Sequence, residues 1–454
     1  MNGFIKTCVT LLGVMLGMAS AMAQNPVIRD QFSADPTARV FNGKIYLFPS
    51  HDIKPPAGQR QDWFCMEDYH VFSSDDLVDF TDHGVIVTQN KVPWVRPNSY
   101  SMWAPDCVYR NGKYYFYFPS APAAGGGFAV GVAVADKPEG PYVPQAEPIK
   151  GIGGIDPCVL QASDGNAYIF WGAGRCAKLK ENMLELADDN PKETMRWGNR
   201  EIESIGVNAL QGMPSRQAEG PFAFEYNGNY YLTYPYVREN TEVLAYGMSK
   251  NPMGPYEYKG LIMAEHANGC WTNHHSIVNF KGQWYLFYHH NDYSPKFDKN
   301  RAVCIDSLFF NPDGTIQEVK PTLRGVGISN ASKPIQIDRY SDIGGGASIE
   351  YLDTLDYFKG WATVFPGEGG WVTYNKVRVA DGGATSVTLR YRAKAATTAT
   401  LQVGAQYKAT LKLPATNNQW KETTLKVKAI KPEVYDLKFT AGGALDVDWI
   451  CMTK

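Results

Sequence analysis

The chain has 454 residues, including 27 Tyr, 21 Phe and 11 Trp, and a formal net charge of −2 at pH 7. This length allows a large core and indicates two or more domains. A charge so close to zero gives no electrostatic basis for nucleic-acid binding. The many aromatic residues suit an all-β protein and also sugar binding, because aromatic rings stack on the apolar faces of sugars.

Residues 1–23 have the three parts of a secretory signal peptide. Lys6 supplies the positive start, residues 8–18 are apolar, and Ala21-Met22-Ala23 forms a small-x-small cleavage site. No cysteine follows the cleavage site directly, so we expect no lipid anchor there. The apolar run is too short to span a membrane, and no other segment qualifies. We therefore expect cleavage after Ala23 and a periplasmic or secreted protein without membrane insertion.

One short pattern occurs five times between residues 41 and 290. Each copy is a turn ending in glycine followed by a strand of alternating aromatic and β-branched residues, which is typical of a β-hairpin. The copies are FNGKIYLFPS (41–50), RNGKYYFYFPS (110–120), SDGNAYIFWG (163–172), YNGNYYLTYP (226–235) and FKGQWYLFYHH (280–290). Their turn glycines are 69, 53, 63 and 54 residues apart, which suits one four-stranded blade per copy. The pattern predicts a five-bladed β-propeller over residues 24–328.

A polar residue lies just upstream of each hairpin. In a propeller the first strand of every blade lines the central channel, so five equivalent positions would point into one funnel. Several acids in one pocket indicate acid–base chemistry. The five residues are Asp35, Asp106, Asp156, Glu219 and His274.

The composition changes after Gly325. Residues 329–347 are rich in Ser, Asn and Gly, and we expect them to form a linker. Residues 348–454 contain short Val- and Thr-rich strands separated by turn residues at regular intervals. This spacing predicts a β-sandwich of the jelly-roll type.

Seven cysteines follow residue 23, and none has the spacing of a zinc site or a CxxC pair. Because the number is odd and the chain is large, we expect buried free thiols and no disulfide framework. They are Cys65, Cys107, Cys158, Cys176, Cys270, Cys304 and Cys451.

Six phrases make residues 24–328 resemble glycoside hydrolase family 43, the five-bladed propeller glycosidases. They occur in the family's order, and together they are far more specific than one Asp-Pro pair. The phrases are Ala34-Asp35-Pro36, Trp103-Ala104-Pro105-Asp106, Ile155-Asp156-Pro157, Glu219-Gly220-Pro221-Phe222, His274-His275-Ser276 and Phe310-Asn311-Pro312-Asp313-Gly314.

The resemblance implies an inverting mechanism that needs no cofactor. It makes Asp35 the general base, Glu219 the general acid, and Asp156 a third carboxylate that orients Glu219 and raises its pKa. Cleavage of a glycosidic bond does need a proton for the leaving oxygen and a base for the attacking water. A neighbouring carboxylate keeps an acid protonated near neutral pH. In this family the acid at Asp106 is usually structural.

The resemblance also suggests binding residues. Trp103 and Trp271 are candidate walls of the sugar pocket, and Arg301 is expected to face a sugar hydroxyl. Adjacent residues on a strand point to opposite faces, and the His-x-Ser pattern selects His274 as the channel-facing histidine. His274 would bind a water-coordinated structural calcium ion or bridge to the acids. Packing roles for both tryptophans, a surface salt bridge for Arg301 and a structural role for His274 remain alternatives.

Residues 348–454 resemble family 6 carbohydrate-binding modules. The resemblance rests on Gly370-Trp371-Val372, on the strand LRYRA (389–393) and on Asp446-Val447-Asp448-Trp449-Ile450. It implies a glycan-binding jelly roll, but the sequence does not locate the binding aromatics. A purely structural partnership with the propeller is therefore the alternative.

These features together predict an exported, inverting, exo-acting glycosidase that removes arabinofuranosyl or xylosyl residues from plant-type polysaccharide. Its partner would be an oligo- or polysaccharide. A galactofuranosidase or galactan-active glycosidase is one alternative, which the presence of Asp35 disfavours. A non-catalytic glycan-binding propeller is another, which the retention of three carboxylates disfavours. The sequence specifies neither the sugar and its linkage nor the oligomeric state.

Overall fold

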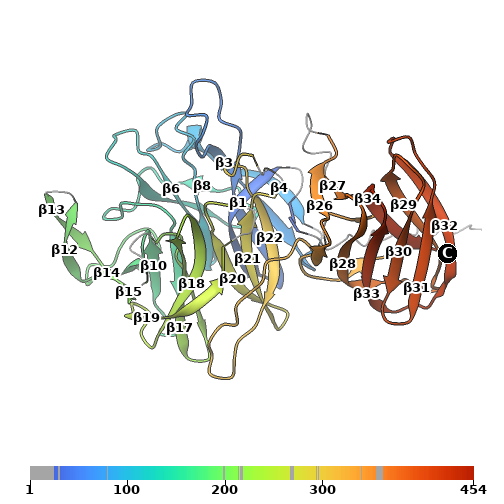
Figure 1. Ribbon diagram of the computed structural model, residues 1–454. Coiled ribbons are helices and arrows are strands. Elements are labelled where there is room, and N and C mark those ends of the chain that lie inside the picture. The colour runs from blue at the N-terminus through green and yellow to red at the C-terminus, as the bar shows by residue number, and fades with distance from the viewer. Residues whose placement is uncertain are drawn as a thin grey trace, which may run out of the picture.

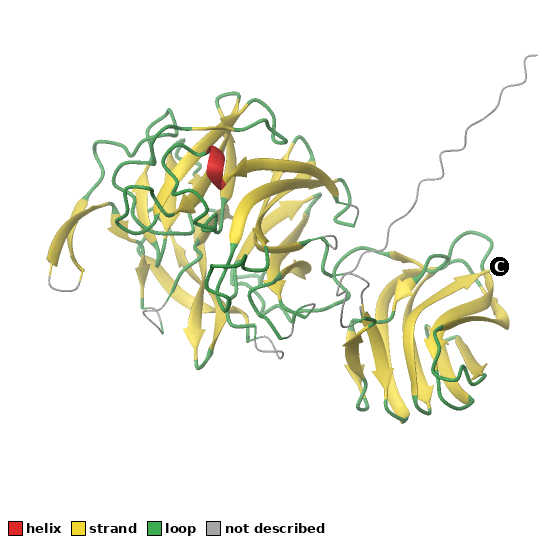
Figure 2. Cartoon of the chain, turned by 90° about the horizontal axis from the view of Figure 1, so that it is seen from above, coloured by secondary structure: helices red, strands yellow, loops and turns green. Residues whose placement is uncertain are grey.

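The computed structural model describes residues 25–454 except 29–30, 79, 198–199, 213, 215–217, 266–269, 293, 295, 339 and 354–360. The expected signal peptide lies outside the described residues. Within the described residues, almost all regular structure is β-strand, and the helical structure is one turn of 3-10 helix, η1 (Gln89–Lys91). Figures 1 and 2 show a larger N-terminal body and a smaller C-terminal one. In the part of the chain that the structure describes, no helix is long and apolar enough to cross a membrane.

The N-terminal body is a five-bladed β-propeller whose sheets follow one another along the chain (Figure 1). The first blade is β1 (Phe32–Phe41), β2 (Lys44–Asp52), β3 (Met66–Ser74) and β4 (Thr81–Thr88); the second is β5 (Asp106–Arg110), β6 (Lys113–Ser120), β7 (Ala129–Ala135) and β8 (Val143–Pro144). The third is β9 (Cys158–Gln161), β10 (Ala167–Trp171), β11 (Arg175–Lys178) and β14 (Val207–Asn208), with a separate hairpin of β12 (Lys192–Trp197) and β13 (Arg200–Ile205). The fourth is β16 (Phe222–Tyr226), β17 (Asn229–Arg238), β18 (Thr241–Ser249), β19 (Tyr256–Met263) and β15 (Leu210–Gln211); the fifth is β20 (His275–Phe280), β21 (Gln283–His290) and β22 (Ala302–Leu308).

The repeated turns explain why each blade begins with a tight hairpin. Four of the five turns have two central residues with φ between +49° and +86°, as the primed hairpin turns require. Asn and Gly tolerate this left-handed region best, which is why the repeated motif carries them. The four turns are Asn42-Gly43, Asn111-Gly112, Asn227-Gly228 and Lys281-Gly282.

The ring is closed where the N-terminal segment meets the fifth blade. The amide of Val27 donates to the carbonyl of Val303 at 2.9 Å, beside β22. The Asn25 side chain donates to the carbonyls of Ile305 (3.1 Å) and Thr322 (2.7 Å) and accepts from the amide of Ile305 (2.8 Å). Because Asn25 is 1% exposed, these hydrogen bonds form away from water and fix the start of the propeller on its last blade.

The C-terminal body is a β-sandwich of two sheets, so the predicted order of a propeller followed by a sandwich is confirmed. One sheet contains β23 (Ser329–Asn330), β25 (Asp342–Gly344), β28 (Glu368–Arg378), β30 (Thr397–Val403), β31 (Tyr407–Leu413) and β33 (Val434–Gly442). The other contains β24 (Ile335–Gln336), β26 (Ser348–Tyr351), β27 (Trp361–Phe365), β29 (Ala384–Arg392), β32 (Lys421–Ile430) and β34 (Leu445–Thr453).

Residues 329–347, which we expected to be a linker, belong to the sandwich. They contain β23, β24 and β25, which pair with the long strands β28 and β34. Their turn-rich composition conceals Ile335 and Ile337, both fully buried in the core of the sandwich. The connection between the domains is therefore short, and Arg324 fastens it by donating to the carbonyls of Gly327 (2.6 Å) and Asn375 (2.8 Å).

All seven cysteines after residue 23 are buried and unpaired. The expectation of free thiols is therefore confirmed.

We predict that Asn25→Ala weakens the propeller. Three buried backbone groups would lose their partner, each at a cost of roughly 1 kcal/mol or more, so the free energy of unfolding should fall by about 3 kcal/mol. Urea unfolding followed by tryptophan fluorescence measures this change. The control is Asn90→Ala, which changes an exposed asparagine of the same domain. Equal free energies of unfolding for the two variants would contradict the role of Asn25 in closing the ring.

Candidate active site

A cavity of about 130 Å³ lies where the blades meet, and residues from all parts of the ring line it. It brings together all six residues expected from the sequence to act at a sugar site, together with His274, and adds several that were not expected. The lining residues are Asp35, Trp63, Phe64, Met66, Trp103, Ala104, Ile155, Asp156, Glu219, Trp271, Thr272, Asn273, His274 and Arg301. Asp106 is not among them, because it is fully buried in a bidentate ion pair with Arg39.

Asp35 and Asp156 share an unusual backbone conformation. Their φ angles are +48° and +59°, in the left-handed region that residues other than Gly, Asn and Asp rarely adopt. At Asp35 the pairing of β1 with β2 shifts register between Ala34 and Thr37. Such a bulge redirects a side chain out of the regular alternation of a strand, and here the carboxyl group of Asp35 lines the cavity.

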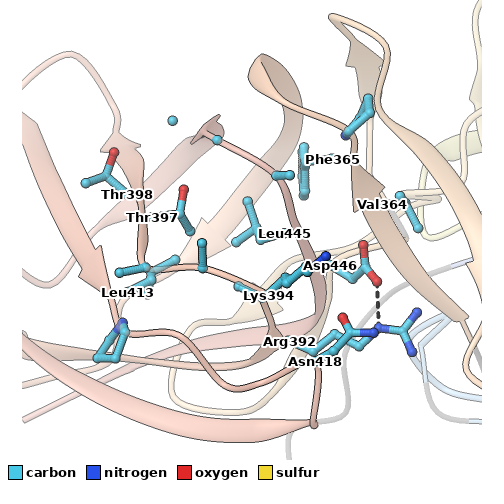
Figure 3. A pocket seen from close by; sticks show the side chains of 18 of the residues that line it. Val364, Phe365, Arg392, Lys394, Thr397, Thr398, Leu413, Asn418, Leu445 and Asp446 are labelled. Carbon is cyan, nitrogen blue, oxygen red and sulfur yellow. Dashed lines mark hydrogen bonds and ion pairs between the residues drawn. The ribbon is translucent and has the colours of Figure 1, made fainter.

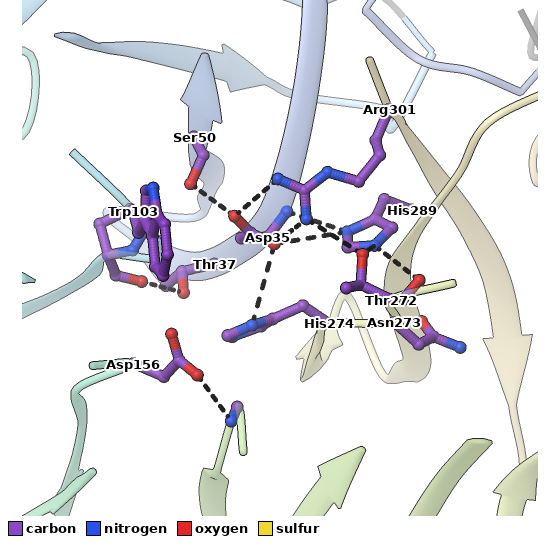
Figure 4. Close-up of polar contacts among 12 residues, drawn as sticks. Asp35, Thr37, Ser50, Trp103, Asp156, Thr272, Asn273, His274, His289 and Arg301 are labelled. Carbon is purple, nitrogen blue, oxygen red and sulfur yellow. Dashed lines mark hydrogen bonds and ion pairs between the residues drawn. The ribbon is translucent and has the colours of Figure 1, made fainter. Parts of the chain in front are cut away.

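Asp35 is surrounded by groups that favour its ionised form (Figure 4). The Ser50 hydroxyl donates to its Oδ2 at 2.7 Å, and Nη1 of Arg301 donates to its Oδ1 at 2.8 Å. Nδ1 of His274 and Nδ1 of His289 lie 3.9 Å and 3.6 Å from Oδ1. Burial alone would raise the pKa of Asp35, but Arg301, the two histidines and Ser50 outweigh it and lower the pKa to about 2. Asp35 is therefore a carboxylate at any physiological pH.

Arg301 is held by two carboxylates at once. Its Nε and Nη2 donate to Asp52 at 2.9 Å each, while Nη1 reaches Asp35. It is 3% exposed, so the surface salt bridge considered as an alternative is wrong. The sequence offered Arg301 as a partner for a sugar hydroxyl, whereas the most direct contacts of its guanidinium are with Asp35 and Asp52. Asp52 was not assigned a role, since nothing in its local sequence shows that β2 ends beside the start of β22.

The other side of the cavity carries a group of carboxyls with a different environment. Oδ2 of Asp156 accepts a hydrogen bond from the amide of Gly220 at 2.9 Å, so Asp156 holds the backbone beside Glu219. Burial raises the pKa of Asp156 well above its ordinary value, and the charges of Glu219 and Asp35 raise it further. Burial and the charge of Asp35 also raise the pKa of Glu219. Protons are therefore retained on this side of the cavity at a pH where Asp35 is ionised.

Glu242 belongs to the same group of carboxyls and was missed in the sequence. It lies on β18 and is 4% exposed, and its carboxyl group forms a hydrogen bond with that of Glu219. The amide of Asn273 also donates to Glu242 Oε2 at 2.7 Å. Burial raises the pKa of Glu242 well above its ordinary value, and the charge of Glu219 adds to this. Its position follows no repeated phrase, so the spacing of motifs could not identify it.

Two histidines lie against Asp35, each through its Nδ1 atom. The amide of Asp35 donates to Nδ1 of His289 at 3.1 Å, so Nε2 carries the proton and donates to the carbonyl of Thr272 at 3.1 Å. Burial lowers the pKa of His289 well below its ordinary value. Burial likewise lowers the pKa of His274, against the opposing charge of Asp35. Both rings are therefore neutral supports of Asp35 at neutral pH.

His274 provides only a weak basis for a calcium site. Calcium binds six to eight oxygen ligands, whereas His274 offers a ring nitrogen. Among the described residues, no cluster of three or more potential metal-ligating side chains includes His274. A calcium ion in the channel would therefore have to be held mainly by water.

Aromatic rings form one wall of the cavity. The Phe64 ring stacks on Trp271 with centroids 6.1 Å apart, and it meets Trp103 edge-on at 6.1 Å. Trp103 also packs on Phe128 at 4.6 Å. Phe64 and Trp63 belong to the loop between β2 and β3, and the sequence pattern gave no means of placing that loop. Such rings can stack on the apolar face of a sugar.

A second cavity, of about 1290 Å³, opens at one end of the sandwich (Figure 3). An ion pair between Arg392 and Asp446 crosses its floor at 2.6 Å. Of the residues that line this cavity only Phe365 is aromatic, and it is 1% exposed. A ligand there would be held by hydrogen bonds and charge, because no ring is presented for stacking.

Residues 23–316 match the model of Glycosyl hydrolases family 43, and residues 341–454 match the carbohydrate binding module of family 6. The chain is similar to xylosidase/arabinosidase 43A of Humicola insolens, with 38% identity over 332 residues covering 65% of this chain and 99% of that protein. It is also similar to a xylosidase/arabinosidase of Bacteroides ovatus, with 35% identity over 326 residues covering 64% of this chain and 95% of that protein.

Solved structures give the same result. A β-xylosidase/α-arabinofuranosidase from a compost microbial metagenome, solved with xylotriose in a calcium-free form, is 33% identical with a TM-score of 0.57, covering 66% of this chain and 98% of that one. An arabinoxylan arabinofuranohydrolase of Bacillus subtilis, 23% identical with a TM-score of 0.52, covers 95% of this chain and 97% of that one and shows that the fold of both domains recurs. The first family model matches well over half of the chain, and the chain therefore belongs to glycosyl hydrolase family 43.

Proposed function

We propose that this glycoside hydrolase is an exported, inverting, exo-acting enzyme that removes arabinofuranosyl or xylosyl residues from plant-type polysaccharide. The observation that carries the proposal is the contrast in ionisation across one cavity: Asp35 has a pKa of about 2, whereas burial raises the pKa of Glu219 and Asp156. Two relatives that match over most of their own length, at 38% and 35% identity, are named xylosidase/arabinosidase, which supports the choice of pentose.

The mechanism follows from that contrast. Asp35 is the base that accepts a proton from the attacking water, and Glu219 donates its proton to the glycosidic oxygen as the bond breaks. Arg301 keeps Asp35 ionised while the site is shielded from water. Asp156 holds the amide of Gly220. Because ionising both Asp156 and Glu219 would place two like charges together, the pair gives up its last proton only at a raised pH. No step in this sequence requires a cofactor.

The size of the cavity supports attack at the end of a chain. A volume of about 130 Å³ corresponds to the liquid-phase share of about four water molecules, which suits one small sugar ring. The aromatic wall of Phe64, Trp103 and Trp271 bounds the site on one side. A polysaccharide chain running through the site would need a longer groove.

A galactofuranose-specific enzyme is the second candidate. A β-D-galactofuranosidase of Aspergillus niger is 28% identical over 361 residues, covering 72% of this chain and 97% of that protein. We further propose that the sandwich contacts glycan outside the cleavage site, and that any calcium in the channel has only a structural role.

The proposed function predicts a ranking of substrates. The enzyme should release nitrophenol from aryl α-L-arabinofuranoside or β-D-xyloside faster than from aryl β-D-galactofuranoside, and NMR should show that the sugar is first released with inverted anomeric configuration. Asp35→Asn should lower kcat by about 10²- to 10⁴-fold, and Glu219→Gln should slow oligosaccharides more than aryl glycosides, which have a good leaving group. Retained configuration, or turnover of galactofuranoside alone, would contradict the proposal.

The contact between Arg301 and Asp35 predicts a shift of the acid limb of the pH–rate profile. Above its pKa of about 2 Asp35 is an active base. In Arg301→Gln the main lowering influence is lost and burial raises the pKa, so kcat/KM should begin to fall at a higher pH as the solution is acidified. Lys299→Gln, which removes a nearby cation that contacts Phe64 and Trp271, is the control and should leave that limb in place. An unmoved acid limb in folded Arg301→Gln would exclude Asp35 as the base that sets it.

The charge that Asp156 can carry predicts a shift of the alkaline limb of the pH–rate profile. Asn can still accept the hydrogen bond from Gly220 but carries no charge, so Asp156→Asn should lower the pKa of Glu219 and make activity fall at a lower pH on the alkaline side. The pH dependence of kcat/KM on an unactivated oligosaccharide tests this, with thermal unfolding as a check on the fold. An alkaline limb at the wild-type pH would mean that Asp156 acts only by positioning.

A further inference from the structure

Three potential metal ligands share one face of the first blade, away from the cleavage residues. His51 lies near the end of β2, and Asp68 and His70 lie two residues apart on the neighbouring strand β3. Side chains at i and i+2 of a strand point to the same face, and neighbouring strands place a third beside them. One potential ligand atom from each of the three residues lies within 4.8 Å of the others.

The two imidazoles are already oriented by carboxylates. Nδ1 of His51 lies 2.7 Å from Oδ1 of Asp68, and Nδ1 of His70 lies 3.0 Å from Oδ2 of Asp82 on β4. The rings are 5.2 Å apart and nearly perpendicular. Asp82, which accepts from Nδ1 of His70, fixes the tautomer and increases the basicity of Nε2, which is the usual second-layer arrangement of a metal-binding histidine. Asp68 is itself a potential ligand, so an ion would replace its hydrogen bond with His51.

The ligand types select a transition metal. Two imidazoles and one carboxylate suit zinc, whose open sites take three protein ligands and one water. Ligand atoms about 2.05 Å from a tetrahedral ion are about 3.3 Å apart. The present spread of up to 4.8 Å would therefore have to contract by about 1.5 Å. The side chains of His51 and Asp68 are 19% and 14% exposed, so the group of ligands reaches the surface and an ion can enter from solvent.

We propose that His51, Asp68 and His70 form a zinc-class metal site, with Asp82 as the partner of His70. The ion would tie together the ends of β2 and β3, the two strands that carry the loop of residues 53–65. Trp63 and Phe64 of that loop line the catalytic cavity. The site is therefore separate from the channel histidine His274 and acts on the stability of the aromatic wall.

The test is calorimetric titration of Zn²⁺ into the full-length protein after removal of metal with EDTA. The wild type should bind one ion that His51→Gln and His70→Gln weaken by more than about 100-fold, and Asp82→Asn should weaken it about 10- to 100-fold as an outer-layer change. His83→Gln is the matched control, because His83 lies on the same blade and its Nε2 forms a hydrogen bond with the Ser73 hydroxyl at 2.8 Å. It should bind like the wild type, and so should His274→Gln.

Thermal unfolding gives a second, independent readout. Saturating Zn²⁺ should raise the Tm of the wild type and of His83→Gln but not that of His70→Gln, because a ligand stabilises only the state that binds it. The proposal is overturned if no Zn²⁺ binds, if His70→Gln binds as tightly as the wild type, or if only His274→Gln loses the ion.

Discussion

The buried fork of Arg301 is the interaction on which both the ring and the chemistry depend. Arg301 directly precedes β22 of the last blade, and its guanidinium binds Asp35 on β1 and Asp52 on β2 of the first blade. The backbone joins the same place, since the amide of Ser33 donates to the carbonyl of Arg301 and the amide of Arg301 donates to Asp52. Removing one member of a buried charge group leaves an uncompensated charge and is costly, so the first blade, the last blade and the ionised Asp35 are maintained together.

The two sides of the cavity differ because only one of them has its cation in direct contact. Arg301 touches Asp35 and lowers its pKa, but it reaches Asp156 and Glu219 only as a weaker influence than burial. Asp156, Glu219 and Glu242 repel one another in a site of low polarity, which favours retention of protons. One enclosed space thus holds an ionised Asp35 and a protonated Glu219 at the same pH, which is the difference that the proposed base and acid require.

The sequence predicted the parts of this site that are tied to the blade repeat. The turns at Asn42-Gly43 and its equivalents set the blades, and four of the five polar residues ahead of them therefore converge on the cavity, Asp106 being the exception. Asp52, Glu242 and Phe64 could not be predicted, because they enter through strand ends and a loop whose course depends on contacts between distant segments. The prediction of a linker over residues 329–347 was wrong for a related reason. Ile335 and Ile337 are isolated apolar residues among turn formers, and only the folded sandwich shows that they are buried in its core.

The strained backbone at Asp35 and Asp156 explains why so short a phrase as Asp-Pro is informative here. A residue before proline avoids helical conformations, and a left-handed φ at Asp costs of order 1–3 kcal/mol. Such strain persists only where the surroundings determine it, and at Asp35 the bulge in β1, the Ser50 hydroxyl and Arg301 all do so. At Asp156 the amide of Gly220, which donates to the carboxyl group, holds the strained conformation. An ordinary turn on the surface would relax, and its Asp-Pro would not share one cavity with Glu219 and His274.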